Sequence, residues 1–158
     1  MKVRKSFLLV ILTIFVFLVS GCSSITQAGK EKTASFKDST GRIVSIKAKP
    51  QRIVSLTLGT DEILLDLVEP ERIAAWTYLA DDQGISFATD KSRLVKSKIR
   101  SNSAEEILAL KPDLVLIADW WGLDMLQTLR DMGVPVYVYK TPYTVSDIKN
   151  TIREVGRV

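Results

Sequence analysis

The chain has 158 residues, with 22 Lys and Arg against 18 Asp and Glu, no histidine and a single cysteine. The lack of histidine excludes catalysis by a histidine acid or base and zinc sites of the Cys/His type. Three basic side chains lie in the first 21 residues, so the net charge falls from +4 to about +1 without them, and no basic cluster interleaved with aromatics suggests nucleic-acid binding.

The N-terminal segment has the layout of a secretory signal. Basic residues stand among the first five positions, and residues 7–19 are apolar except for Thr13. This run is shorter than the ~18 residues that a membrane-spanning helix needs. Small residues then precede Cys22. Residues 1–21 are therefore predicted to be a cleaved signal peptide. The alternative is an uncleaved membrane anchor with an incidental cysteine.

A cysteine directly after small residues at the cut resembles a bacterial lipobox. The resemblance implies that Cys22 receives a diacylglycerol and becomes the first residue of a lipoprotein, held on the extracytoplasmic face of the cell membrane. The following residues, 22–35, are small, polar and charged. Such a composition predicts a flexible tether between the lipid and a folded domain.

The next segments predict a hairpin and then an alternation of strands and helices. Residues 36–46 fit a hairpin with its turn at residues 39–41, and Pro50 breaks the chain. Strands are expected at 52–56, 72–76, 94–99 (the weakest), 113–118 and 134–139. Helices are expected at 61–68, from 103 to Lys111-Pro112, at 123–132 and from 144 onwards, and the long segment 79–92 is expected to be a polar loop.

Two helix starts have recognisable caps. Thr60 is the expected N-cap of the helix at 61–68, whose first turn carries two acids that suit the helix dipole. Ser103 and Glu106 fit a capping box at the next helix. The apolar run at 113–118 is too short for a helix and is typical of a buried parallel strand.

This alternation predicts an α/β fold with a mainly parallel sheet flanked by helices and preceded by a β-hairpin. Ligands of such sheets bind outside the carboxyl ends of the strands.

No Gly-x-Gly-x-x-Gly, P-loop or Gly-x-Ser-x-Gly motif is present, so we expect no enzyme and no cofactor. Asp81 and Asp82 could bind a cation, although a solvated polar loop is the commoner explanation. A secreted enzyme using an acid pair is the weakest alternative.

Several stretches together resemble the substrate-binding proteins of bacterial ABC importers for ferric siderophores, haem and cobalamin. The most specific one is the pattern E-x-I-x-x-L-K-P-D-L-V at 105–115, and the others are 38–42, 50–56, 60–64 and 133–136. The resemblance covers residues 36–158. It implies an N-terminal lobe at 36–143 and the start of an inter-lobe helix at 144–158. Since the family has two lobes, the second lobe is expected to be absent and the chain to be truncated.

The candidate ligand-binding residues follow the predicted strands. Aromatic side chains suit a flat chelate through stacking, and a guanidinium suits its anionic oxygens. The resemblance also places ligand contacts on the loop before the first helix, whose free N–H groups can meet ligand oxygens. The candidates are Thr57, Leu58, Gly59, Thr60, Trp76, Tyr78, Arg100, Trp120 and Trp121. Trp76 fits a core position equally well, and Arg100 fits a solvated surface position.

The resemblance implies partners as well as a ligand. The family's glutamate at the position of Glu105 docks onto the permease, so we expect an ABC permease dimer with its ATPase, a metal chelate and the membrane as partners, and no nucleic acid. An exposed acid at a helix N-terminus is the plainer explanation of Glu105. The alternative function is a membrane-tethered single-lobe interaction or sensor protein, or a non-functional fragment.

Overall fold

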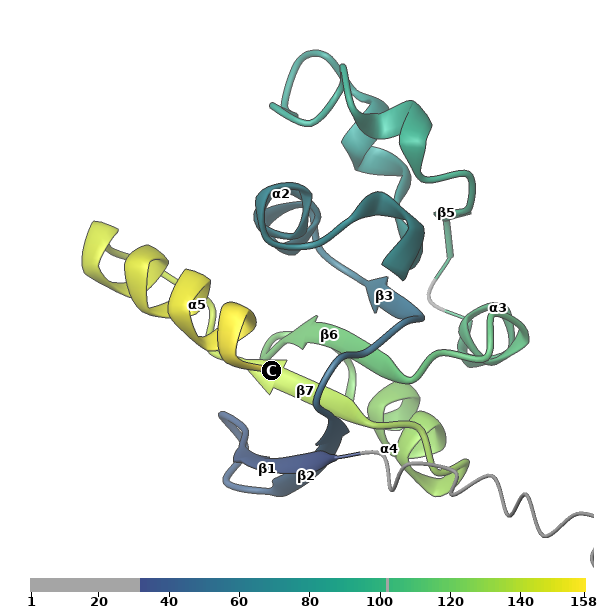
Figure 1. The fold of residues 1–158 in the computed structure, drawn as a ribbon, viewed down its shortest axis with the longest axis vertical. Helices are drawn as coiled ribbons and strands as arrows, with labels where there is room; N and C mark the ends of the chain where they lie inside the picture. Colours follow the sequence, from purple (N-terminus) through teal and green to yellow (C-terminus); the bar gives the residue numbers. More distant parts are fainter. Residues whose placement is uncertain (1–31, 102) are drawn as a thin grey trace, which may run out of the picture. The chain divides into compact units, whose positions relative to one another are not determined.

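A computed structural model describes residues 32–101 and 103–158. Its strands and helices alternate as the sequence predicts (Figure 1). The strands are β1 Thr33–Lys37, β2 Ile43–Lys47, β3 Ile53–Ser55, β4 Ile73–Thr77, β5 Lys98–Ile99, β6 Leu114–Ala118 and β7 Val136–Tyr139. The α-helices are α2 Leu58–Leu67, α3 Ala104–Ala109, α4 Leu123–Asp131 and α5 Val145–Arg157, and the 3-10 helices are η1 Pro70–Arg72, η2 Tyr78–Asp81 and η3 Ser92–Leu94.

The central sheet has five parallel strands in the order β5-β4-β3-β6-β7. Strand β6 lies between β3 and β7 and is buried along its whole length, as its continuous apolar sequence predicts. The edge strand β5 is only two residues long, so the strand expected at 94–99 is mostly the 3-10 helix η3 and a connecting segment. The α/β class and the mainly parallel sheet are confirmed.

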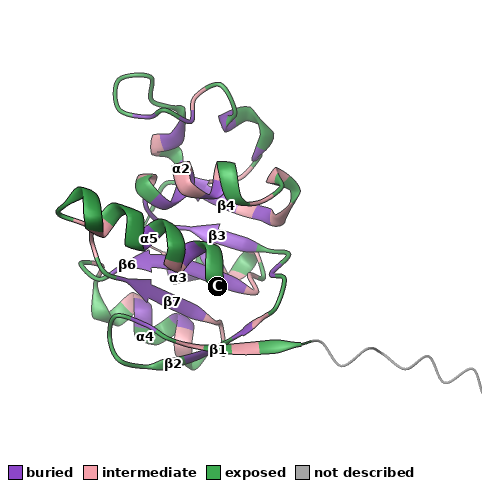
Figure 2. Cartoon of the chain, turned by 60° about the vertical axis from the view of Figure 1, so that its left-hand side comes forward, coloured by how far each residue is buried: buried purple, intermediate pink, exposed green. Residues whose placement is uncertain are grey.

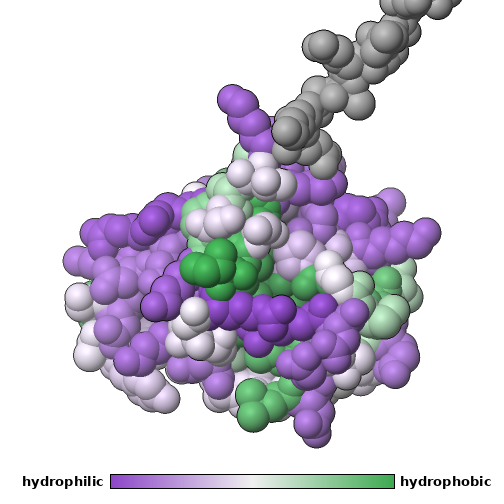
Figure 3. Space-filling model, turned by 90° about the horizontal axis from the view of Figure 1, so that it is seen from below, coloured by the Kyte–Doolittle hydropathy of each residue, from purple (hydrophilic) through white to green (hydrophobic). Residues whose placement is uncertain are grey.

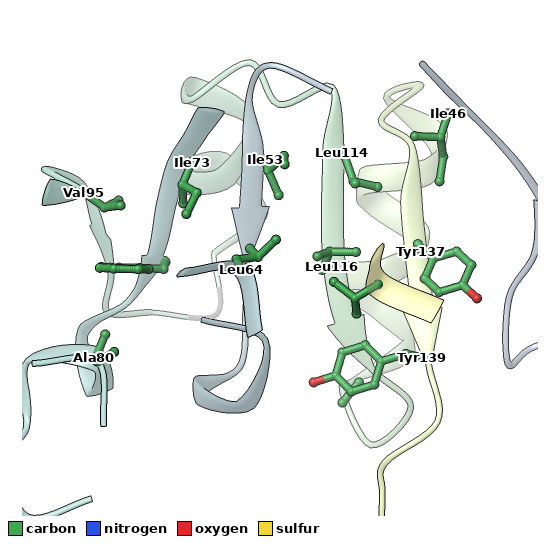
Figure 4. Packing of buried hydrophobic residues seen from close by; sticks show 14 of the residues in the cluster. Ile46, Ile53, Leu64, Ile73, Ala80, Val95, Leu114, Leu116, Tyr137 and Tyr139 are labelled. Carbon is green, nitrogen blue, oxygen red and sulfur yellow. The ribbon is translucent and has the colours of Figure 1, made fainter. Parts of the chain in front are cut away.

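Helices cover both faces of the sheet, with α2 and α5 on one face and α3 and α4 on the other (Figure 1). Successive residues of β6 alternate between the two cores, because side chains along a strand point to opposite faces. Leu114 and Leu116 join the core that contains Leu64 of α2 (Figure 4). Val115 joins the other core with Leu129 of α4.

The hairpin β1–β2 begins at Thr33 and is antiparallel. The tether expected at 22–35 is therefore shorter than predicted, because residues 33–35 pair with β2. The hairpin turn is attached to the main sheet by a hydrogen bond from the Ser39 N–H to the Val138 carbonyl at 2.8 Å. Gly41 has a φ of 84°, a left-handed conformation that suits the turn.

The caps of α2 and α3 differ from the expectation. The N-cap of α2 is Thr57, so Thr60 lies inside the first turn and the helix begins three residues earlier than predicted. Ser103 does cap α3 by accepting a hydrogen bond from the Glu106 N–H. The Glu106 carboxylate, however, accepts from the Ser101 hydroxyl at 2.6 Å, so only half of the expected capping box forms.

Helix α5 begins at the expected Thr144 cap with a complete capping box to Asp147. Its buried contacts come from Thr151 and Val155, while the neighbouring Ile148 and Ile152 remain 47% and 40% exposed. The apolar stripe of this helix is therefore only partly covered by the described residues.

Buried residues concentrate in the sheet and exposed residues on the outer sides of the helices (Figure 2). The face seen from below is mostly hydrophilic with separate hydrophobic areas (Figure 3). Among the residues that the structure describes, no helix is long and apolar enough to cross a membrane.

Candidate functional site

A cleft of about 470 Å³ lies at the carboxyl ends of the central strands, where a parallel sheet is expected to bind its ligand. Its walls come from the segments that follow β3, β4, β5, β6 and β7. The lining residues are Leu56, Thr57, Leu58, Gly59, Thr77, Tyr78, Leu79, Ile99, Arg100, Ser101, Trp120, Trp121, Tyr139, Thr141 and Pro142. Seven of the nine predicted ligand-binding residues are in this set.

Tyr78 and Arg100 form a pair on one wall of the cleft. The guanidinium carbon of Arg100 lies 5.5 Å from the centroid of the Tyr78 ring, within the range of a cation–π contact. Both side chains remain exposed, Tyr78 to 45%. Arg100 therefore has a defined place beside an aromatic ring, unlike a freely solvated arginine, and its charge faces the cleft.

Trp120 and Trp121 form a stacked aromatic pair at the end of β6. Their ring centroids are 5.3 Å apart and their planes differ by 24°. Trp121 packs partly into both cores, while Trp120 is 64% exposed. Trp121 thus fixes the position of the pair, and Trp120 offers its free surface to the cleft. A large exposed indole is available for stacking on a flat ligand.

The loops after β6 and β7 are held together by Asp119. Its Oδ1 accepts hydrogen bonds from the Thr141 N–H at 3.1 Å and from the Thr141 hydroxyl at 2.5 Å. The bond from the Thr141 side chain is the main cause that lowers the pKa of Asp119 below its usual value. This contact joins the segment that carries Trp120 to the one that carries Pro142.

Two predicted residues lie outside the cleft. Trp76 is completely buried in the core, where the Lys98 ammonium lies 5.1 Å from its ring centroid, so the core alternative is correct for this residue. Thr60 is also fully buried and lines a different groove of about 470 Å³ between α2 and α5. Its place in the first helical turn, one turn after the cap, turns its side chain away from the cleft.

A buried hydroxyl network underlies the loop from β3 to α2. The Thr60 hydroxyl lies 2.6 Å from that of Ser55 and 2.8 Å from that of Thr57, and Thr57 also bonds to the Tyr139 hydroxyl. Tyr139 comes from β7 (Figure 4), and it lines both the cleft and the groove between α2 and α5. Burial is the main cause that raises the pKa of Tyr139. The network connects the first turn of α2 to the far side of the cleft.

Eight of the fifteen lining residues were not predicted from the sequence, and three of these, Thr77, Tyr139 and Thr141, also take part in the hydrogen bonds described here. Thr77 is the last residue of β4, Tyr139 is the last residue of β7, and Thr141 follows β7 two residues later. The same positional signal that selected Trp120 was therefore available for them. The sequence does not single them out, because a threonine or a buried tyrosine does not by itself indicate a ligand-binding position.

Asp61 is a fully buried carboxylate behind the same wall. Its Oδ2 accepts hydrogen bonds from the Thr77 N–H at 3.1 Å and from the Thr77 hydroxyl at 2.5 Å. Burial raises the pKa of Asp61 to about 7, against the opposing effects of the nearby Ser55 and Thr77 donors and the positive charge of Lys98. Oδ1 is buried with no hydrogen-bond partner of ordinary geometry in the described part of the chain.

The remaining predicted residues lie away from the cleft or outside the described chain. Glu105 is exposed at the start of α3, where its carboxylate accepts from the Ser103 hydroxyl at 2.6 Å, the main cause that lowers its pKa. Cys22 and the signal segment lie outside the described residues. Within residues 32–101 and 103–158, no group of three or more Asp, Glu or Cys side chains could hold a metal ion.

The chain resembles known proteins in sequence and in fold. The "Uncharacterized ABC transporter substrate-binding lipoprotein YvrC" of Bacillus subtilis is 26% identical over 150 residues, which cover 88% of this chain and 46% of that relative. The crystal structure of the haem binding protein HmuT is 23% identical with a TM-score of 0.65, over 80% of this chain and 40% of that one.

Two further structures show the same fold. A periplasmic solute binding protein from Veillonella parvula is 25% identical with a TM-score of 0.60, and the match covers 80% of this chain and 40% of that one. Unliganded FhuD2 from Staphylococcus aureus is 21% identical with a TM-score of 0.63, over 79% and 43% of the two chains.

In all four comparisons the chain spans less than half the length of the protein that it matches. Residues 53–158 contain all five strands of the parallel sheet and helices α2 to α5. The model of the periplasmic binding protein family matches residues 53–158, which is more than half of the chain. The chain therefore belongs to the periplasmic binding protein family.

Proposed function

We propose that this chain is part of the extracytoplasmic solute-binding component of an ABC importer, and that the importer's ligand is a metal chelate such as a ferric siderophore, haem or cobalamin. The observation that carries the proposal is the cleft at the strand ends, which combines the exposed aromatic surfaces of Tyr78 and Trp120 with the charge of Arg100. The names of the B. subtilis relative and of HmuT support it.

The chemistry of the cleft suits a flat anionic ligand. The rings of Tyr78 and Trp120 offer apolar area to a porphyrin, a corrin or a catecholate. The Arg100 guanidinium suits a carboxylate or the metal-bound oxygens of a chelate. The N-terminus of α2 adds backbone N–H groups at Leu58 and Gly59, which suit negatively charged ligand atoms. Binding and delivery need no covalent chemistry.

The proposal includes the setting in which the lobe acts. A diacylglycerol on Cys22 would hold the protein at the extracytoplasmic face of the cell membrane, and the name of the lipoprotein relative supports this location. Glu105 would meet basic residues of the permease, since it is exposed on α3 and does not line the cleft. Its carboxylate accepts from the nearby Ser103 hydroxyl and the residue remains exposed, which leaves it accessible to a partner.

Ligand titration with tryptophan fluorescence tests the proposal. The 158-residue chain is titrated with haemin, cyanocobalamin and a ferric tris-catecholate, beside Trp120→Ala and Arg100→Gln variants. We expect saturable quenching by at least one probe, with dissociation constants above about 1 μM, since tight sites bury about 70 to 90% of a ligand's surface. Both variants should weaken that binding, and Arg93→Gln on η3 is the control. Absence of quenching by all three probes, or equal affinity in all variants, contradicts the proposal.

A further inference from the structure

Behind the candidate cleft lies an ionisable group that the proposed binding chemistry does not use. Asp61 has no exposed surface, and it stands in the first turn of α2, below the wall that carries Tyr78. A buried carboxylate is costly unless it has partners. Here one oxygen receives two hydrogen bonds from Thr77, and the other has no partner of ordinary hydrogen-bond geometry in the described structure, although the Ser55 hydroxyl lies close enough to lower the pKa of Asp61. Burial of the Asp61 carboxylate therefore lowers the stability of the fold more than an apolar side chain at the same place would.

The two bonds act on the place where β4 ends and the cleft begins. Thr77 is the last residue of β4, and the next residue, Tyr78, lines the cleft. The Thr77 backbone and side chain both bind the same oxygen, so its φ, ψ and χ1 angles are restricted together. The Tyr78 ring in turn supports the Arg100 guanidinium at 5.5 Å. A line of direct contacts thus runs from Asp61 to the charge at the cleft.

We propose that Asp61 is a positioning residue of the cleft: its charged carboxylate fixes the end of β4 through Thr77 and so holds the Tyr78–Arg100 pair in place for the ligand, and protonation of Asp61 weakens this hold. The inference rests on the proposed function for its ligand, though not for the contact itself. Hydrogen bonds to an ionised acceptor are roughly twice as strong as those to a neutral one. The protonated acid can still accept both hydrogen bonds from Thr77, but these bonds are weaker because the acceptor is no longer charged.

The surroundings allow this change of charge near neutral pH. Burial raises the pKa of Asp61 to about 7. The charged or titratable groups near it are Lys98 of β5, which lowers this pKa, and Tyr139 of β7, whose own pKa the Asp61 charge raises. Lys98 is itself paired with Asp81 of η2 at 2.7 Å. The contacts from β3 and β4 are the hydroxyl groups of Ser55 and Thr77.

Nuclear magnetic resonance of the 158-residue chain in detergent micelles tests the contact without any ligand. We expect the Thr77 amide and the Tyr78 ring signals to shift together between about pH 6 and 8, with the same midpoint as the Asp61 carboxyl carbon. Asp61→Asn should abolish this shift. Asp66→Asn is the matched control, because Asp66 is an exposed acid of the same helix that pairs with Lys91. A flat Thr77 signal in the wild type, or the same shift in Asp61→Asn, overturns the proposal.

A second series separates positioning from general destabilisation. Thr77→Ser keeps both donors to Asp61, whereas Thr77→Val keeps only the N–H. With the three probes named above, we expect about fivefold weaker binding in Asp61→Asn and Thr77→Val at pH 8, and a smaller loss in Thr77→Ser, which keeps both donors and removes only a methyl group from the cleft. Probe binding by the wild type should weaken by a similar factor on acidification to pH 6, whereas probe binding by Asp61→Asn should be the same at both pH values. If no probe binds, the proposed function fails, while the Thr77 and Tyr78 signals still decide the role of Asp61.

Discussion

The Arg130 guanidinium lies 2.8 Å from Oδ2 of Asp38, and the Asp38 side chain is completely buried. Oδ1 of the same carboxylate accepts from the Thr40 N–H, the Thr40 hydroxyl and the Arg42 N–H. One side chain therefore closes the hairpin turn and binds α4 at the same time. This contact fixes the turn of the N-terminal hairpin to α4, between two residues that are 92 positions apart in the sequence.

Arg130→Met should lower the free energy of unfolding by about 3 kcal/mol, because it leaves the buried Asp38 carboxylate without its charged partner. Chemical denaturation measures the change. Adding Asp38→Asn to the same chain should recover part of the loss, since the uncompensated charge is then removed. Arg153→Met, at an exposed position of α5, is the control and should stay within about 0.5 kcal/mol of the wild type. An equal effect of both arginine variants contradicts the structural role of the pair.

The tryptophans should separate stability from binding. Trp76→Ala removes a fully buried side chain and should cost about 3 to 5 kcal/mol. Trp120→Ala removes a ring that is 64% exposed and should change stability by less than about 0.5 kcal/mol while weakening chelate binding. Thermal unfolding and fluorescence titration of both variants check this. A large loss of stability in Trp120→Ala would show that its ring belongs to the core.

Asp61 should make stability depend on pH in a defined direction. Its pKa in the folded protein, about 7, is above the ordinary value of 3.8, so the folded state binds the proton more tightly. Its contribution is fully present below about pH 4 and is lost as pH rises through 7. The difference can reach the order of 4 kcal/mol. Subtracting the unfolding free energies of Asp61→Asn from those of the wild type, from pH 4 to 8, isolates this dependence, and a constant difference contradicts it.

Glu105 and its neighbour should differ in their effect on transport. In an importer with a complete binding protein and permease, Glu105→Ala should lower uptake while leaving stability within about 0.5 kcal/mol, because the residue is exposed. Glu106→Ala should leave uptake largely unchanged. Its effect on melting should be smaller than a full capping box implies, since its carboxylate binds Ser101 and not the cap. Wild-type uptake in Glu105→Ala contradicts permease docking.

Cys22→Ser tests the lipid anchor. Metabolic labelling with palmitate should mark the wild-type chain and not the variant, which should be released or remain unprocessed. Each buried CH₂ of an acyl chain contributes about 0.8 kcal/mol, so two or more chains hold a protein firmly. Cell fractionation supplies the second measurement. Equal labelling of both proteins contradicts the lipobox interpretation.

The sequence alone determined the order of the elements and the side of the sheet that carries the cleft. Alternating strand and helix patterns are local, since the buried run at 113–118 and the Gly133 stop are each visible within a few residues. The rule that parallel sheets bind ligands at the carboxyl ends of their strands then selected Tyr78 and Trp120. These choices needed no knowledge of distant contacts.

The tertiary structure alone decided which strand-end residues face the cleft. Trp76 and Tyr78 stand two positions apart, and only the packing of α2 and the position of Lys98 show that the first is core and the second is cleft. Asp61 looked like an ordinary acid in a first helical turn, where the dipole favours it. Its carboxylate is buried and binds Thr77, a residue 16 positions away in the sequence. Such contacts depend on how the helices settle on the sheet, which local patterns do not specify.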